Sequence, residues 1–122
     1  MNKVDGRTWT PAAALEALGR SKAEFVTLFE QGTLEVEIYR PVGVDGQKPH
    51  AKDELYVVIA GSGTFVHGAG RTPFGPGDAL FVRAGIVHRF EDFTPDFATW
   101  VFFYGPEGGE WAVQRGSVDP RL

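Results

Sequence analysis

The sequence predicts an all-β domain, either a sandwich or a barrel, with one short helix near its N-terminus. Short apolar runs recur along the chain, and turn-forming segments such as GSG, GAG, TPFGPGD, RAG and GPEGG separate nearly all of them. Sixteen glycines and eight prolines in 122 residues supply these turns. Many short strands at regular spacing, with almost no helical periodicity, are typical of sandwiches and barrels.

The one predicted helix follows Thr10 and Pro11. Threonine is a favourable N-cap, proline suits the first helical position, and AAALEAL continues the helix until Gly19, which we expect to end it. A helix this short must pack against another element to persist.

After this helix, the apolar residues recur with the period of a strand. Phe25–Phe29 and Leu34–Tyr39 are predicted to form a hairpin around Gly32. In the second of these runs the residues alternate, so one face is apolar and the other is partly polar. Further strands are expected at residues 55–60, 64–67, 79–82, 87–90, 97–104 and 111–113.

Length and composition predict one soluble domain over residues 1–122, with a barrel core at about 24–114. The net charge is −4, and lysine and arginine do not cluster, which argues against nucleic acid as a partner. We found no signal-peptide pattern and no apolar stretch of membrane-spanning length, and the chain has no cysteine. We therefore expect a cytoplasmic protein without a membrane partner.

Polar residues open the apolar strand in the segment PHAKDELYVVIAG. If the chain is extended from residue 48 onward, Lys48, His50 and Glu54 share one face with Tyr56, and Asp53 points to the other side. A buried carboxylate and imidazole need partners. They either pair with each other and with a basic side chain, or they hold a cation.

A third candidate ligand lies in the segment GDALFVRAGIVHRFED. His88 follows a glycine-bounded corner there and opens another short strand. Two histidines and one glutamate from two strands form a ligand set that leaves coordination positions open. Such a set suits non-haem Fe(II), and also Mn, Ni or Zn.

The two segments resemble the two motifs of the cupin superfamily. His50, Glu54 and Gly61 match the second histidine, the glutamate and the closing glycine of the first motif, and Gly77, Gly85 and His88 match the second motif. The chain departs from the motifs at four positions, which are Val42 for a glycine, Lys48 for the first histidine, Arg83 for a proline and Asp92 for an asparagine.

The resemblance implies a jelly-roll barrel, also called a double-stranded β-helix, in which His50, Glu54 and His88 bind a divalent metal. The chain is similar to short bacterial single-domain cupins, which are often dimers. Both faces of FATWVFFY read as buried, and a second copy of the chain would cover one of them, so we expect a homodimer. The candidates for binding a small-molecule ligand beside the metal are Lys48, Tyr56, Trp100 and Phe102.

Three functions remain open at this point. The first is a metal-dependent enzyme that acts on a small organic metabolite, with dioxygenase-like or isomerase-like chemistry, although no catalytic acid or base is identified beyond the ligand set. The second is a non-catalytic module that binds or senses a metal or a small molecule. The third is a metal-free barrel in which Lys48 pairs with Glu54.

Overall fold

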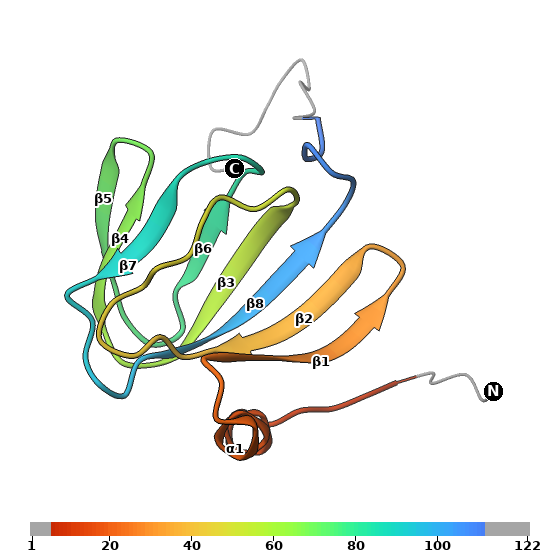
Figure 1. The fold of residues 1–122 in the computed structure, drawn as a ribbon, viewed down its shortest axis with the longest axis vertical. Helices are drawn as coiled ribbons and strands as arrows, with labels where there is room; N and C mark the ends of the chain where they lie inside the picture. Colours follow the sequence, from red (N-terminus) through yellow and green to blue (C-terminus); the bar gives the residue numbers. More distant parts are fainter. Residues whose placement is uncertain (1–5, 112–122) are drawn as a thin grey trace.

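The computed structural model describes residues 6–111, which fold into a jelly-roll barrel of two facing antiparallel sheets (Figure 1). The strand order is β1-β2-β8-β3-β6 in the larger sheet and β5-β4-β7 in the smaller one. The elements are α1 (Pro11–Ser21), β1 (Phe25–Gln31), β2 (Leu34–Tyr39), β3 (Asp53–Ala60), β4 (Gly63–His67), β5 (Gly70–Phe74), β6 (Ala79–Val82), β7 (His88–Glu91) and β8 (Ala98–Tyr104).

Helix α1 begins as predicted, and it ends later than predicted. The Thr10 side chain accepts a hydrogen bond from the Ala13 amide at 3.1 Å, and Pro11 opens the helix. The helix continues through Gly19 to Ser21, so the predicted end is wrong. Glu16 and Arg20, one turn apart, form an ion pair at 2.7 Å that spans Gly19, and the residue that leaves the helix in a left-handed conformation is Lys22.

Most strands lie where the alternating pattern predicts them, and the β1–β2 hairpin turns at Gly32. The sequence analysis missed β5, because its segment GRTPF contains a proline and too few apolar residues. This strand lies at an edge of the smaller sheet, where proline is tolerated. Trp111 is not in a strand, and the rest of the strand predicted at 111–113 lies outside the described residues.

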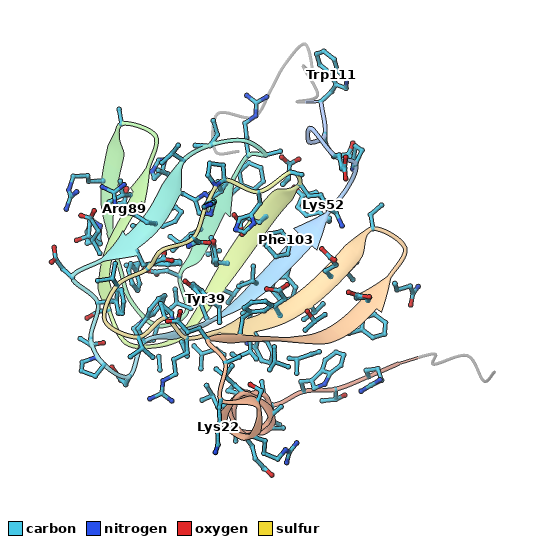
Figure 2. The ribbon with its side chains drawn as sticks, viewed as in Figure 1. Lys22, Tyr39, Lys52, Arg89, Phe103 and Trp111 are labelled. Carbon is cyan, nitrogen blue, oxygen red and sulfur yellow. The ribbon has the colours of Figure 1, made fainter. Side chains whose placement is uncertain are left out.

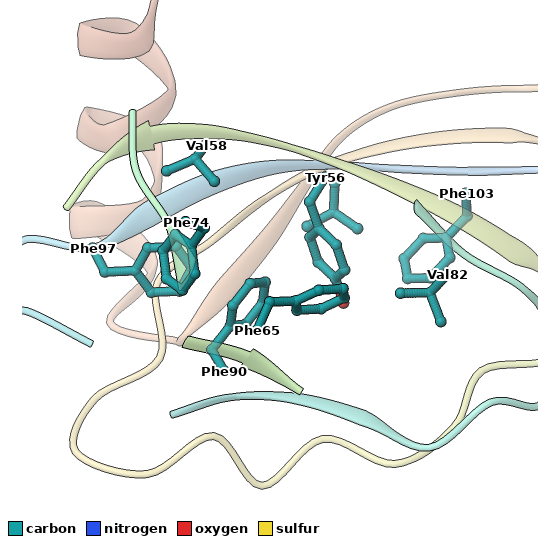
Figure 3. Packing of buried hydrophobic residues seen from close by; sticks show 9 residues of the cluster. Tyr56, Val58, Phe65, Phe74, Val82, Phe90, Phe97 and Phe103 are labelled. Carbon is teal, nitrogen blue, oxygen red and sulfur yellow. The ribbon is translucent and has the colours of Figure 1, made fainter. Parts of the chain in front are cut away.

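The two sheets enclose an aromatic core (Figure 3). From the larger sheet, Tyr56 and Val58 of β3 and Val101 and Phe103 of β8 point inward. From the smaller sheet and its connections come Phe65, Phe74, Phe90 and Phe97. The ring centroids of Phe90 and Phe97 lie 4.7 Å apart, within the range of favourable aromatic contacts.

Strand β2 carries its glutamates inside the barrel and its aliphatic residues outside. Glu35 and Glu37 of β2 line the cavity between the sheets. Tyr39 of the same strand, labelled in Figure 2, lines it as well. Ile38 points the other way and packs under Ala14 and Leu18 of α1. Helix α1 therefore covers an outer apolar face, and part of the barrel interior is left polar.

Helix α1 has eleven residues, far fewer than the roughly 20 that span a bilayer. Among residues 6–111, no helix meets the length and hydropathy that a membrane crossing requires.

Candidate metal site and its cavity

The three predicted metal ligands come from separate parts of the fold. Glu54 lies near the start of β3, and His88 is the first residue of β7 on the opposite sheet. His50 lies in the connection between β2 and β3 rather than in a strand. The Gly85 amide donates a hydrogen bond to the His50 carbonyl at 2.8 Å, which ties the loop of His50 to the turn before His88.

The structure brings His50, Glu54 and His88 to one point. One ligand atom from each of the three lies within 4.8 Å of the others. Glu54 Oε1 is 2.6 Å from His88 Nε2 and 3.8 Å from His50 Nε2. The imidazole rings of His50 and His88 lie 5.3 Å apart, centroid to centroid.

The contact between Glu54 and His88 does not have the geometry of a hydrogen bond. Glu54 is 1% exposed, and neither of its carboxylate oxygens has a hydrogen-bond partner among the described residues. A buried carboxylate without a partner is costly. Atoms that are close but not directed at each other are what a shared cation requires, because ligands bonded at about 2.0–2.2 Å lie roughly 3 Å apart around it. The donor set and its geometry therefore fit a divalent metal.

His88 is oriented for metal binding by its other ring nitrogen. Nδ1 lies 2.8 Å from the Ile86 carbonyl, so in the neutral ring Nδ1 carries the proton and donates it. The lone pair is then on Nε2, the atom beside Glu54. Metal-bound histidines are usually fixed in this way by a backbone carbonyl or a carboxylate.

Burial and charge act in opposite directions on the pKa of His88 and in the same direction on the pKa of Tyr56. Burial lowers the pKa of His88, but the nearby Glu54 carboxylate and the Ile86 carbonyl outweigh this effect, so the pKa lies above its usual value. Burial, reinforced by the charge of Glu54, raises the pKa of Tyr56 well above its usual value.

A buried hydrogen-bond network that the sequence patterns do not predict lies next to the candidate metal ligands. The Tyr56 hydroxyl lies 3.1 Å from His88 Nε2 and donates to Gln47 Oε1 at 3.0 Å, and the same oxygen is 3.1 Å from His50 Nε2. Asp45, which is 5% exposed, accepts hydrogen bonds from the Gln47 side chain and from the Tyr39 hydroxyl.

Asp45 also accepts a hydrogen bond from the Phe90 amide at 2.8 Å. Strand β7 is an edge of its sheet, so this amide has no strand partner on that side. The connection between β2 and β3 runs beside β7 (Figure 1), and Asp45 closes the edge there. In the sequence, Asp45 stands in GVDG, which reads as an ordinary turn.

A cavity of about 690 Å³ opens beside Glu54. It contains Lys52 and four glutamates, and its apolar wall includes Val101 and Phe103 of β8. Its lining residues are Glu24, Phe25, Glu35, Glu37, Tyr39, Gly46, Gln47, His50, Ala51, Lys52, Glu54, Tyr56, Val101 and Phe103. Its size suits a small organic molecule.

Glu37 is the most perturbed carboxyl group of this cavity. Burial raises its pKa to about 7, and the charges of Glu35, Glu54 and Glu30 add to the effect, while a hydrogen bond with Thr27 opposes it. No basic group pairs with Glu37 among the described residues. Glu35, by contrast, lies 3.4 Å from Lys52 Nζ.

Of the four predicted ligand-binding residues, only Tyr56 lines the cavity. Trp100 lies on the opposite face of β8 and packs against the cluster under α1. Phe102 also points to that outer face, because it pairs with Val36 of β2 and Leu55 of β3, which lie there. The aromatic strand thus presents Val101 and Phe103 to the cavity, and the expectation for Trp100 and Phe102 is corrected.

Lys48 is exposed and does not line the cavity. The sequence analysis assumed an extended chain from residue 48, but β3 begins only at Asp53, so the alternation does not apply before it. The basic groups beside Glu54 are His50 and His88, and the pairing of Lys48 with Glu54 is therefore wrong for this structure. Asp53 is buried and accepts hydrogen bonds from the amides of Ala84 and Glu110.

Comparison with known proteins places this geometry in a family. The Cupin domain model matches residues 32–104, more than half of the chain. An uncharacterised protein of Streptomyces coelicolor, SCO3923, is 38% identical over 63 residues, which cover 52% of this chain and 60% of that protein. The chain thus spans less than two thirds of the length of the curated relative that it matches.

Two solved structures have the same fold. A cupin-2 domain containing protein from Shewanella frigidimarina superimposes with a TM-score of 0.54 at 13% identity, over 66% of this chain and 79% of that chain. The DMSP lyase DddQ from Ruegeria pomeroyi superimposes with a TM-score of 0.56 at 26% identity, over 66% of this chain and 46% of that chain. With the matching family model and the jelly-roll topology, these findings show that the chain belongs to the cupin domain family.

Proposed function

We propose that this cupin binds one divalent metal through His50, Glu54 and His88 and holds a small organic molecule in the adjoining cavity. The observation that carries the proposal is the Glu54 carboxylate, which is buried, has no hydrogen-bond partner among residues 6–111, and lies 2.6 Å from Nε2 of His88. A divalent cation is the ligand that satisfies all three side chains at once.

The same ligand set supports a catalytic role for the metal. Three protein ligands leave positions open for a substrate, and a divalent cation bound there would supply Lewis-acid or redox chemistry. The protein would contribute the enclosed cavity and the Tyr56 hydroxyl, which lies beside the ligands and could hold or transfer a proton. Dioxygenase-like and isomerase-like reactions both remain within this proposal, and the similarity to a lyase adds an elimination as a third reaction class.

A non-catalytic module that binds or senses a metabolite is the alternative within the same site. It would use the same metal and the same cavity, and it would differ only in leaving the bound molecule unchanged. Turnover of candidate metabolites by the metal-loaded protein distinguishes the two. A homodimer and a cytoplasmic location are also parts of the proposal.

Cobalt titration of metal-depleted protein tests the metal site directly. We expect one Co²⁺ to bind per chain, with visible absorption bands that report nitrogen and oxygen ligands. His88→Ala should weaken binding at least about tenfold, because it removes one of three protein ligands. His67→Ala is the matched control, since His67 is an exposed histidine on the neighbouring strand, directly opposite His88. Equal cobalt binding by wild type and His88→Ala would contradict the proposal.

A further inference from the structure

The cavity carries opposite charges at its two ends once a divalent metal is bound. At the metal end, the Glu54 carboxylate and a divalent cation leave a formal surplus of positive charge. At the other end, Glu24, Glu35 and Glu37 are balanced by one lysine, Lys52. A ligand that fills this cavity therefore meets a cation at one end and an uncompensated carboxylate at the other.

Glu37 is the carboxylate at the far end that has no partner of opposite charge within residues 6–111. Lys52 lies beside Glu35 and also donates to the Thr33 carbonyl at 2.6 Å. Glu24 accepts a hydrogen bond from the Val42 amide at 2.6 Å. Glu37 thus remains available to a positively charged group of a ligand, and Glu54, the unpartnered buried carboxylate, opens into the same cavity.

Strand register fixes how far apart the two ends are. Glu35 pairs with Phe103, which pairs in turn with Glu54, so the three residues form one row across β2, β8 and β3. Two interstrand spacings separate the ends of the row, which is roughly 10 Å between backbones. Glu37 lies in the next row on the same face, opposite Val101. The apolar side chains of Val101 and Phe103 line the space between.

We propose that the molecule held in this cavity is a zwitterion, with an anionic group that binds the metal, an apolar spacer, and an ammonium or other cationic group that binds Glu37. This inference deepens the proposed function and rests on it. Glu37 is partly buried and has Thr27 but no basic side chain as a partner among the described residues, which is costly for a charged carboxylate, and the space before it suits a short aliphatic spacer. The assignment makes Glu37 a specificity-determining residue that does not touch the metal.

Three hydroxamates of matched length test the inference by affinity rather than turnover. Each chelates the metal through the same head, and the tails end in an ammonium (ε-aminocaproyl hydroxamate), a methyl (caproyl hydroxamate) or a carboxylate (adipoyl monohydroxamate). Calorimetry on the Zn²⁺-loaded protein should find the ammonium tail about tenfold tighter than the methyl tail, and the carboxylate tail the weakest. The metal content is measured again after each titration.

Glu37→Gln should abolish the preference for the ammonium tail and leave the affinity of the methyl tail unchanged, which also confirms that the variant is folded and loaded. Glu107→Gln, which changes an exposed glutamate outside the cavity, should keep the preference. Equal affinities for all three tails in the wild type, or a preference that survives in Glu37→Gln, would overturn the inference while the metal site stands. Failure of every hydroxamate to bind the Zn²⁺-loaded protein would instead contradict the proposed function.

Discussion

The Gly85 amide donates a hydrogen bond to the His50 carbonyl, and this bond ties the loop that carries His50 to the turn that precedes His88. Gly85 has a φ of +82°, which residues with a side chain adopt only at a cost. No atom outside its immediate neighbours lies within 4 Å of the position that a Cβ would occupy, so the cost of a substitution would come from the backbone alone.

We predict that Gly85→Ala weakens metal binding out of proportion to its effect on stability. The left-handed conformation should cost about 1–2 kcal/mol of unfolding free energy, and relaxation of the turn would move His50 relative to His88. Gly32→Ala is the control, because Gly32 has a φ of +58° in the β1–β2 turn and an equally open Cβ position. Denaturation and Co²⁺ titration of both variants check the prediction. It fails if both variants bind Co²⁺ with wild-type affinity.

Replacement of Glu37 should stabilise the protein at alkaline pH. Its pKa rises from 4.5 in the unfolded chain to about 7 in the fold, so between these values the folded state holds the extra proton and stability falls as the pH rises. The full shift corresponds to roughly 3 kcal/mol, and partial solvent screening reduces it to about 1–2 kcal/mol.

Glu37→Gln should therefore be more stable than wild type at pH 8 by that amount and nearly equal to it below pH 4.5. Because Glu30, Glu35, Glu54 and Lys52 also surround this position, the difference between variant and wild type is measured rather than either curve alone. Urea denaturation in the presence of a chelator, at several pH values, gives this difference. A gap that does not change with pH would contradict the assigned pKa.

Asp45 should be essential for the arrangement of the site although it contacts no metal ligand directly. Its carboxylate accepts hydrogen bonds from Tyr39, Gln47 and the Phe90 amide, and Asp45→Ala leaves these buried donors unpaired. We expect a loss of about 2–4 kcal/mol in unfolding free energy. Asp96→Ala, at an exposed position, should cost less than about 1 kcal/mol. Similar losses in the two variants would show that the buried network is not a major support.

The exposed apolar residues on the outer face of the larger sheet predict a homodimer. Phe81 is 50% exposed there, and Leu55, Val57 and Phe102 beside it are only partly covered. Phe81→Asp should dissociate a dimer that uses this face, so light scattering should report a mass near 13.3 kDa for the variant and twice that for the wild type. Val42→Asp, at an exposed loop residue, is the control. A wild-type mass of one chain would exclude the dimer.

The sequence predicted the fold and the convergence of His50, Glu54 and His88, because strand alternation and the two motifs depend on local spacing. Glu54 and Tyr56 share the inner face of β3, as alternation requires. Alternation also defined the two faces of β8, but it did not identify which face is inside, and Trp100 was placed in the cavity for that reason. The inner face is decided by α1, which packs against the outer side of Ile38 and Trp100.

The polar part of the site was less predictable because it lies on a loop. Lys48 was placed by extending the strand pattern into residues that do not form a strand. Asp45 and Gln47 act through hydrogen bonds across long sequence separations, up to Phe90, for which the sequence has no periodic signal. The sequence shows the alternating glutamates Glu35 and Glu37 in β2. That these glutamates point into the barrel depends on α1, which packs against the opposite face of the strand.

Elemental analysis of protein purified without chelator tests the central claim most directly. We predict close to one divalent metal ion per wild-type chain, a similar content in His67→Ala, and only trace metal in His88→Ala and Glu54→Ala. Trace metal in the wild type, with no uptake of Fe²⁺, Mn²⁺, Ni²⁺ or Zn²⁺ after incubation, would contradict the account.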